Sequence, residues 1–142
     1  MKHVLPYLSF DGTCREAMAF YQECLGGEYY QMTFAEGEGP GQFQAAEDAK
    51  DRLLHAALKK GDFLLMASDA MPGMPFDVGN NVAVLLVCDS DDEVDSLFEK
   101  MKAGGREVMA PGDAFWGARF AMLTDRFGIN WMLSHEKVPA NV

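Results

Sequence analysis

The stretch from Asp113 to Glu136, DAFWGARFAMLTDRFGINWMLSHE, decides how the rest of the chain is interpreted. It holds two short apolar runs, Ala118 to Leu123 and Ile129 to Leu133, separated by Asp125-Arg126-Phe127-Gly128. An acidic residue followed by a glycine supplies turn chemistry, so the stretch predicts a β-hairpin. Just before the first run, Phe115-Trp116-Gly117 sets two aromatic rings against a glycine, a combination typical of close backbone approach. We therefore expect this corner to form the rim of a pocket.

Composition limits the classes of protein to consider. The chain has 142 residues, 49% of them apolar, which is enough for one domain with a buried core. Acidic residues outnumber basic ones 22 to 12, and the net charge of −10 opposes binding to nucleic acid or to an anionic membrane. No apolar run approaches the roughly 20 residues that span a bilayer, and Met1-Lys2-His3 leads into a strand-like segment instead of a signal peptide. We expect a cytoplasmic protein whose partners are small molecules or proteins.

The three cysteines, Cys14, Cys24 and Cys88, are odd in number and lack metal-type spacing, which suits a reducing compartment. Cys14 lies near the start of a predicted helix beside Arg15, where a thiolate is favoured. The alternative is that Cys14 is a small buried hydrophobic residue.

Secondary-structure signals occur twice in the same order. In the first half we expect strands and a helix at these positions: strand His3 to Phe10, helix Cys14 to Leu25, strand Glu28 to Ala35, and hairpin strands Leu53 to Lys59 and Phe63 to Ser68. In the second half we expect strand Asn81 to Val87, helix Ser90 to Ala103 capped by Ser90 or Asp91, strand Arg106 to Met109, loop Pro111 to Gly117 and the closing hairpin. The glycine-rich segment from Glu36 to Arg52 is predicted to be a mobile loop, either a lid or an exposed connection.

This repetition predicts the fold. Lys60-Gly61-Asp62-Phe63-Leu64-Leu65-Met66-Ala67-Ser68 and Phe127-Gly128-Ile129-Asn130-Trp131-Met132-Leu133-Ser134 place a glycine, an apolar run, a methionine and a serine at matching offsets. We expect an α+β fold of duplicated βαβββ modules forming a half-open eight-stranded barrel with a central cleft. The single domain 1–142 would contain module one at 1–70, a linker at 71–80 and module two at 81–136.

Two-residue alternation along the strands assigns their faces. The helix-facing residues are predicted to be Leu65, Ala67, Val82, Val84, Leu86, Trp131 and Leu133. The residues of opposite parity, which would line the cleft, are Leu64, Met66, Ser68, Ala83, Leu85, Asn130, Met132 and Ser134.

Nearly the whole chain resembles the vicinal oxygen chelate superfamily of glyoxalases, bleomycin-resistance proteins and extradiol dioxygenases. The narrower resemblance is to its PhnB-like group, sometimes labelled as a 3-demethylubiquinone methyltransferase domain. The motifs that show it are Pro6-Tyr7-Leu8-Ser9-Phe10-Asp11-Gly12, Cys14-Arg15-Glu16-Ala17, Leu25-Gly26-Gly27, Leu54-His55-Ala56, Met66-Ala67-Ser68-Asp69 and Phe115-Trp116-Gly117 followed by Asp125-Arg126-Phe127-Gly128-Ile129-Asn130-Trp131.

Enzymes of this superfamily hold a divalent metal ion with four strand residues. The resemblance places Pro6 or its neighbour, Met66, Ala83 or its neighbour, and Met132 at those positions. Thioethers suit soft ions, and proline and alanine side chains offer no donor, so we expect no metal ion and no cofactor.

Several side chains remain candidates for chemistry. His55 could shuttle protons if a carboxylate or hydroxyl lies beside it, and otherwise is structural. Asp69 and Asp125, at matching strand ends, could bind a cation or amine or simply cap turns. Arg119 could hold a carboxylate or phosphate. The expected ligand-binding residues are Tyr7, Met66, Ser68, Phe115, Trp116, Met132 and Ser134.

Two functions follow as hypotheses. The first is a metal-free protein that binds a small planar or amphipathic ligand in an apolar, methionine-lined cup. The second is a lyase, isomerase or dioxygenase of the same superfamily, metal-dependent or assisted by His55, with Arg119 and Asp125 as further catalytic residues. Because half-barrels of this superfamily commonly pair, the resemblance also implies a homodimer.

Overall fold

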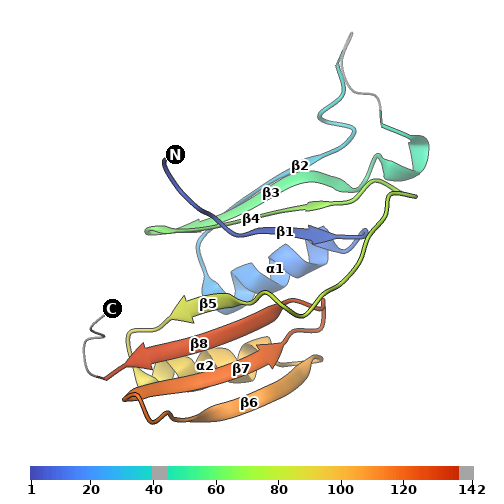
Figure 1. Cartoon of the computed structure of the whole chain (residues 1–142). Helices are drawn as coiled ribbons and strands as arrows, with labels where there is room; N and C mark the ends of the chain where they lie inside the picture. Colours follow the sequence, from blue (N-terminus) through green and yellow to red (C-terminus); the bar gives the residue numbers. More distant parts are fainter. Residues whose placement is uncertain (40–44, 138–142) are drawn as a thin grey trace. The chain divides into compact units, whose positions relative to one another are not determined.

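The computed structural model describes residues 1–39 and 45–137, and the chain divides into two compact units (Figure 1). Unit one comprises Met1–Asp77 and unit two Val78–Val142. The boundary falls inside the segment 71–80 predicted as a linker. The segment from Glu36 to Arg52, predicted to be a mobile loop that is either a lid or an exposed connection, lies partly outside the described residues. Its described part contains a short 3-10 helix, Glu47–Ala49.

Both units contain the same elements in the same order. Unit one consists of β1 (Tyr7–Phe10), α1 (Cys14–Leu25), β2 (Glu28–Thr33), β3 (Leu53–Lys60) and β4 (Phe63–Asp69). Unit two consists of β5 (Val84–Val87), α2 (Asp91–Met101), β6 (Arg106–Asp113), β7 (Ala118–Thr124) and β8 (Asn130–Glu136). Within the described residues, the strand order is β1-β4-β3-β2 in one sheet and β5-β8-β7-β6 in the other. The predicted α+β fold with duplicated βαβββ modules is therefore confirmed.

The closing hairpin has the predicted turn. Strands β7 and β8 pair antiparallel, with Thr124 opposite Asn130. Between them the Gly128 amide donates to the carbonyl of Asp125 at 3.0 Å. Gly128 has a φ of +92°, a conformation that residues with a Cβ rarely adopt, which explains the glycine at this position.

The three largest errors in the predicted element limits concern β1, β5 and β6. Strand β1 begins at Tyr7 and not at His3, because Pro6 has no amide hydrogen to add to the ladder. Strand β5 begins at Val84 and not at Asn81. Strand β6 continues to Asp113, through the first part of the predicted loop, because irregular register at its bulges accommodates Pro111 on an edge strand.

Each helix packs on one face of its own sheet, α1 against β3 and β4, and α2 against β6, β7 and β8. The helix-facing strand residues Leu65, Ala67, Trp131 and Leu133 are fully buried, as predicted. The buried residues of α1 include Ala17, Met18 and Tyr21, and those of α2 are Val94, Phe98 and Met101. Val82 was wrongly assigned to this set, since it precedes β5 and is 74% exposed.

Candidate functional site

The sheet face opposite α1 brings four predicted residues of unit one together. Tyr7 on β1 is the register partner of Met66 on β4, and Ser68 lies two residues further along the same face. The Tyr7 Oη and His55 Nδ1 atoms lie 3.1 Å apart, although His55 belongs to β3. Because β4 lies between β1 and β3, this contact spans the strand that presents Met66 and Ser68. We call Tyr7, His55, Met66 and Ser68 the Tyr7–His55 site.

The Tyr7 hydroxyl is the kind of neighbour that proton transfer by His55 was expected to need. Depending on the tautomer, Nδ1 either accepts the phenolic hydrogen or donates its own, and Nε2 takes the opposite role. A ring held in this way can present Nε2 to a bound molecule as an acceptor or a donor. Tyr7 is 48 residues from His55 and was not predicted as its partner.

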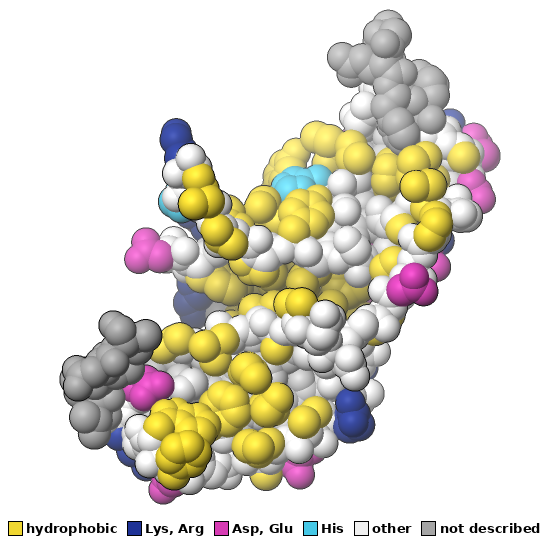
Figure 2. Space-filling view, in the orientation of Figure 1, with side chains coloured by type: hydrophobic (Ala, Val, Ile, Leu, Met, Phe, Trp, Pro, Cys, Tyr) yellow, Lys and Arg dark blue, Asp and Glu magenta, His cyan; other side chains and the backbone are white. Residues whose placement is uncertain are grey.

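In unit two, the face opposite α2 is arranged in rows across the strands. Met132 on β8 lies between Met122 on β7 and Leu85 on β5. In the next row, Ser134 lies between Phe120 and Val87. Hydrophobic side chains gather over this sheet in the space-filling view (Figure 2). Phe120 and Met122 were not predicted as lining residues, although alternation along β7 puts them on the same face.

The two aromatic residues of the predicted rim lie at a hairpin turn between β6 and β7. Phe115 is 98% exposed and its ring contacts Trp116 edge to face, with centroids 5.1 Å apart. Trp116 in turn packs against Phe120 at 5.6 Å. The expected close approach at Gly117 was wrong, because a Cβ there would have no neighbour within 4 Å. The glycine is needed for its φ of +90° in the turn.

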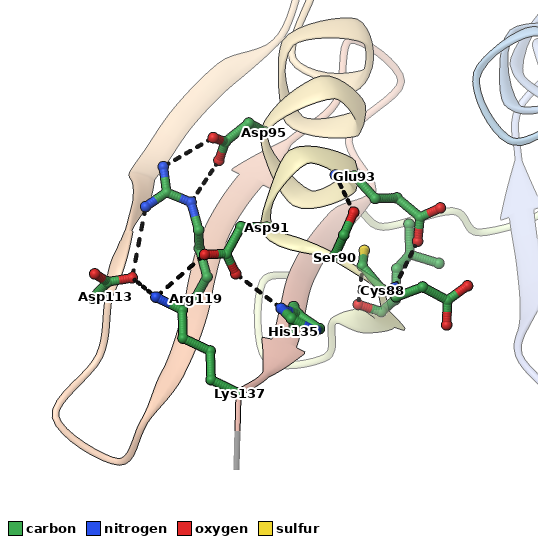
Figure 3. A network of polar contacts seen from close by, with 11 residues as sticks. Cys88, Ser90, Asp91, Glu93, Asp95, Asp113, Arg119, His135 and Lys137 are labelled. Atoms are coloured by element: carbon green, nitrogen blue, oxygen red, sulfur yellow. Dashed lines mark hydrogen bonds and ion pairs between the residues drawn. The ribbon is translucent and has the colours of Figure 1, made fainter. Parts of the chain in front are cut away.

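Arg119 lies on the opposite face of the same sheet, where it holds α2 to the strands (Figure 3). Its Nε and Nη2 donate to the two carboxylate oxygens of Asp95 at 2.8 and 3.0 Å. Asp113 lies 3.7 Å from its Nη1. The hydrogen bond to Asp95 raises the pKa of Arg119 above its ordinary value.

The same network continues through Lys137 and His135 (Figure 3). Lys137 Nζ contacts Asp113 at 2.7 Å and Asp91 at 3.2 Å, and His135 Nδ1 lies 2.8 Å from Asp91. The hydrogen bond with His135 lowers the pKa of Asp91, and the one from Lys137 lowers the pKa of Asp113. These ion pairs link the start of α2 to the ends of β6 and β8.

Asp69 and Asp125 are buried and occupied by hydrogen bonds from their own unit. Asp125 accepts from the amides of Phe127 and Ile129 at 2.8 and 3.0 Å and from Trp131 Nε1 at 2.8 Å. Asp69 accepts from three amides, those of Gly12, Cys14 and Leu53. These contacts favour the turn-capping alternative for both aspartates.

The structure does not bring Arg119 and Asp125 together. They stand at opposite ends of β7, six residues apart, which at the rise of an extended strand is roughly 20 Å. Arg119 also lies on the other side of the sheet from Met132 and Ser134. The two residues therefore do not form one catalytic pair on that sheet.

The donor set does not fit the divalent metal ion that the superfamily implies. Met66 and Met132 offer thioethers, and Pro6 and Ala83 offer no side-chain donor. In residues 1–39 and 45–137, there is no group of three or more His, Cys, Asp or Glu residues arranged to hold a metal ion. Of the two alternatives for Cys14, the structure favours a buried hydrophobic residue over a thiolate, because the side chain is buried and burial raises the pKa of its thiol to about 12.

The helices in the described part of the chain are all too short or too polar to cross a membrane.

Comparisons with known proteins agree with this architecture. A family model described as the Glyoxalase/Bleomycin resistance protein/Dioxygenase superfamily matches residues 2–133. The chain is 34% identical to Protein YjdN of Escherichia coli, over 91% of this chain and 92% of that protein. It is also similar to the crystal structure of protein PA1353 from Pseudomonas aeruginosa, with a TM-score of 0.83, 39% identity, and coverage of 96% of this chain and 98% of that one.

A PhnB protein from Bacillus cereus shares the fold, with a TM-score of 0.73 at 22% identity, over 94% of this chain and 99% of that one.

Proposed function

Because the chain belongs to the glyoxalase/bleomycin resistance protein/dioxygenase superfamily, we propose that it binds a small planar or amphipathic molecule without a divalent metal ion. The observation that supports this most is the Tyr7–His55 site, where a hydrogen-bonded phenol and imidazole stand beside a thioether and a hydroxyl. Ligand sites are typically apolar surfaces with a few fixed polar groups. The same description applies to the rows of Met132 and Ser134 in unit two.

The polar pair would orient the ligand, and the methionines would adapt to its shape. Thioether side chains are flexible and polarisable, so they accommodate irregular planar surfaces. Phe115 and Trp116 remain proposed ligand contacts, through stacking at the hairpin turn. The thioethers and the non-coordinating side chains at the implied metal positions support binding that needs no hard cation.

Titration of metal-free protein tests the proposal. The full chain, treated with a chelator, is screened by thermal shift against a metabolite panel, and hits are measured by isothermal titration. We expect His55→Gln or Tyr7→Phe to weaken binding by about tenfold, because each disrupts the hydrogen bond between Tyr7 and His55 and leaves the other side chain less fixed. His3→Gln, which changes an exposed histidine near the N-terminus, is the matched control and should bind as the wild type does.

A stoichiometric metal ion in purified protein, required for binding, would contradict the proposal. So would hits whose affinity is the same in His55→Gln and wild type.

A second function, general acid or base catalysis by His55, is favoured by the 3.1 Å contact with Tyr7. A lyase or isomerase reaction would use Nε2 to move a proton while the phenol fixes the tautomer. Under this proposal His55→Ala abolishes turnover of a bound substrate without unfolding the chain, as checked by circular dichroism. Retained turnover would remove His55 from the mechanism.

The homodimer remains a proposal, supported by the resemblance and by exposed aromatic side chains such as Phe115. Sedimentation equilibrium over a concentration series measures it directly. A single species of monomer mass throughout would contradict it.

A further inference from the structure

A cavity of about 370 Å³ opens in unit two at the end of the sheet where β7 turns into β8. Its polar lining comes from Asn80, Arg106, Thr124 and Asn130, and its apolar wall includes Val78 and Gly128. This volume is within the range of small-molecule sites.

Three of these polar residues, Arg106, Thr124 and Asn130, form a row across neighbouring strands. Arg106 on β6 is the register partner of Thr124 on β7, which is the partner of Asn130 on β8. Side chains of register partners lie on the same face, about 5 Å apart at their Cβ atoms. On β7 and β8 the next pair on this face is Met122 and Met132. The polar row therefore borders an apolar surface.

Hydrogen bonds connect this row to the backbone. Asn130 Nδ2 donates to the carbonyl of Val82 at 3.2 Å and to that of Gly79 at 3.4 Å. The Thr124 hydroxyl donates to Asn130 Oδ1 at 2.9 Å, and Arg106 Nη2 makes a long contact of 3.5 Å with Thr124 Oγ1. Both side-chain amide hydrogens of Asn130 are thus used by backbone carbonyls, and the hydroxyl hydrogen of Thr124 is used by Asn130. The remaining donors belong to the guanidinium of Arg106.

Two other arginines of the chain are held in ion pairs. Arg52 pairs with Asp11, and Arg119 pairs with Asp95 and Asp113. Arg106 makes no ion pair with any residue that the structure describes. In a chain of net charge −10, a guanidinium at a cavity without an acidic partner is a specific place for an anion.

We propose that this cavity binds the carboxylate of a small molecule whose remaining part is apolar. A guanidinium presents parallel N–H groups that match the two oxygens of a carboxylate. The single positive charge of Arg106 suits a carboxylate. Val78 and the neighbouring pair Met122 and Met132 suit the apolar part of the ligand. The inference rests on the proposed function and names the class of ligand.

A matched pair of probes tests it with the full chain. Isothermal titration measures the affinities of 3-phenylpropionate and of 3-phenylpropanol, which differ only in the head group. We expect the wild type to prefer the acid, and Arg106→Gln to lower its affinity by about 10- to 100-fold, the usual loss of a charged hydrogen-bond partner. Affinity for the alcohol should change less than about twofold, since no charged contact is lost.

Three further variants separate a local contact from other effects. Arg126→Gln removes the same charge from the neighbouring turn, where the guanidinium lies over Phe127 at 5.0 Å, and should leave the preference intact. Arg106→Lys keeps the charge without the planar fork and should retain part of the preference. Thr124→Val removes the hydroxyl that positions Arg106, and should reduce affinity for the acid but not for the alcohol.

Equal binding of acid and alcohol to the wild type would overturn the carboxylate site and leave the proposed function standing. Failure of both probes to bind would also overturn this site, while the metabolite panel would still decide the proposed function. An equal loss of affinity for the acid in Arg126→Gln and Arg106→Gln would show that only the overall charge of the protein matters. That result would contradict the inference. Thermal unfolding of each variant confirms that it is folded.

Discussion

At the residue scale, the two aspartates at matching strand ends have structural surroundings that their positions alone did not reveal. Asp125 is 3% exposed and its two oxygens together accept from two amides and the Trp131 indole. An asparagine there keeps one accepting oxygen and turns an NH₂ group toward a donor. Asp125 therefore matters for the turn that joins β7 to β8.

We predict that Asp125→Asn lowers the free energy of unfolding by about 2 to 3 kcal/mol, because it leaves a buried donor unsatisfied. Urea denaturation followed by circular dichroism measures the change. Asp89→Asn, at an exposed position before α2, is the control and should shift stability by less than about 0.5 kcal/mol. Equal stability of Asp125→Asn and wild type would show that the three hydrogen bonds are unimportant.

At the scale of elements, the two helices begin differently although they are equivalent in the duplicated fold. Ser90 Oγ accepts from the Glu93 amide at 3.0 Å, and Glu93 Oε1 accepts from the Asp89 amide at 3.0 Å. Thr13 precedes α1 but its side chain makes no capping hydrogen bond. There the carboxylate of Asp69, from β4, accepts from the amides of Gly12 and Cys14.

We predict that Ser90→Ala destabilises the chain by about 1 kcal/mol, the usual value of a capping side chain. Thr13→Ala should cost less than about 0.5 kcal/mol, because no cap is lost. Chemical denaturation of both variants compares the two helix starts directly. Equal losses would mean that the Ser90 hydrogen bond does not determine the stability of α2.

At the scale of the whole molecule, groups with shifted pKa values limit stability at both ends of the pH range. The pKa values of Asp91 and Asp113 are below their ordinary value of 3.8, so their contribution is present above that pH and is lost as pH falls through the lowered values. Burial raises the pKa of Cys14 from 9.0 to about 12. Its contribution is complete below 9.0 and is lost as pH rises toward 12.

We predict that, above the ordinary thiol pKa, the free energy of unfolding of the wild type falls relative to that of Cys14→Ala. The expected fall is about 1.4 kcal/mol per pH unit. The unfolded wild-type chain gains by ionising its thiol, and the variant has no thiol at this position. Urea denaturation at a series of alkaline pH values measures the difference. A constant difference across the series would show that Cys14 ionises as readily in the folded chain as in the unfolded one.

Local sequence patterns were sufficient to predict the helices and strands of this chain and their duplication. The helix predicted from Cys14 to Leu25 was found with those limits, because apolar spacing and the following glycines act within a few residues. The assignment of Leu65 and Trp131 to the helix-covered faces also held, since alternation along a strand is a local property. The largest errors arose at the ends of β1, β5 and β6, and at β1 and β6 a proline or a bulge changes the pairing.

Which side chains become partners depended on the register between strands distant in sequence. The order β1-β4-β3-β2 brings Tyr7 to His55, and the pairing of β6, β7 and β8 sets Arg106, Thr124 and Asn130 in one row. Packing of α2 on its sheet places Asp95 beside Arg119, whereas Arg106 lies at a cavity and makes no ion pair with the residues that the structure describes. Residue types along the chain were therefore enough to predict the family and the two modules. The candidate sites were determined by contacts between strands, which no local periodicity encodes.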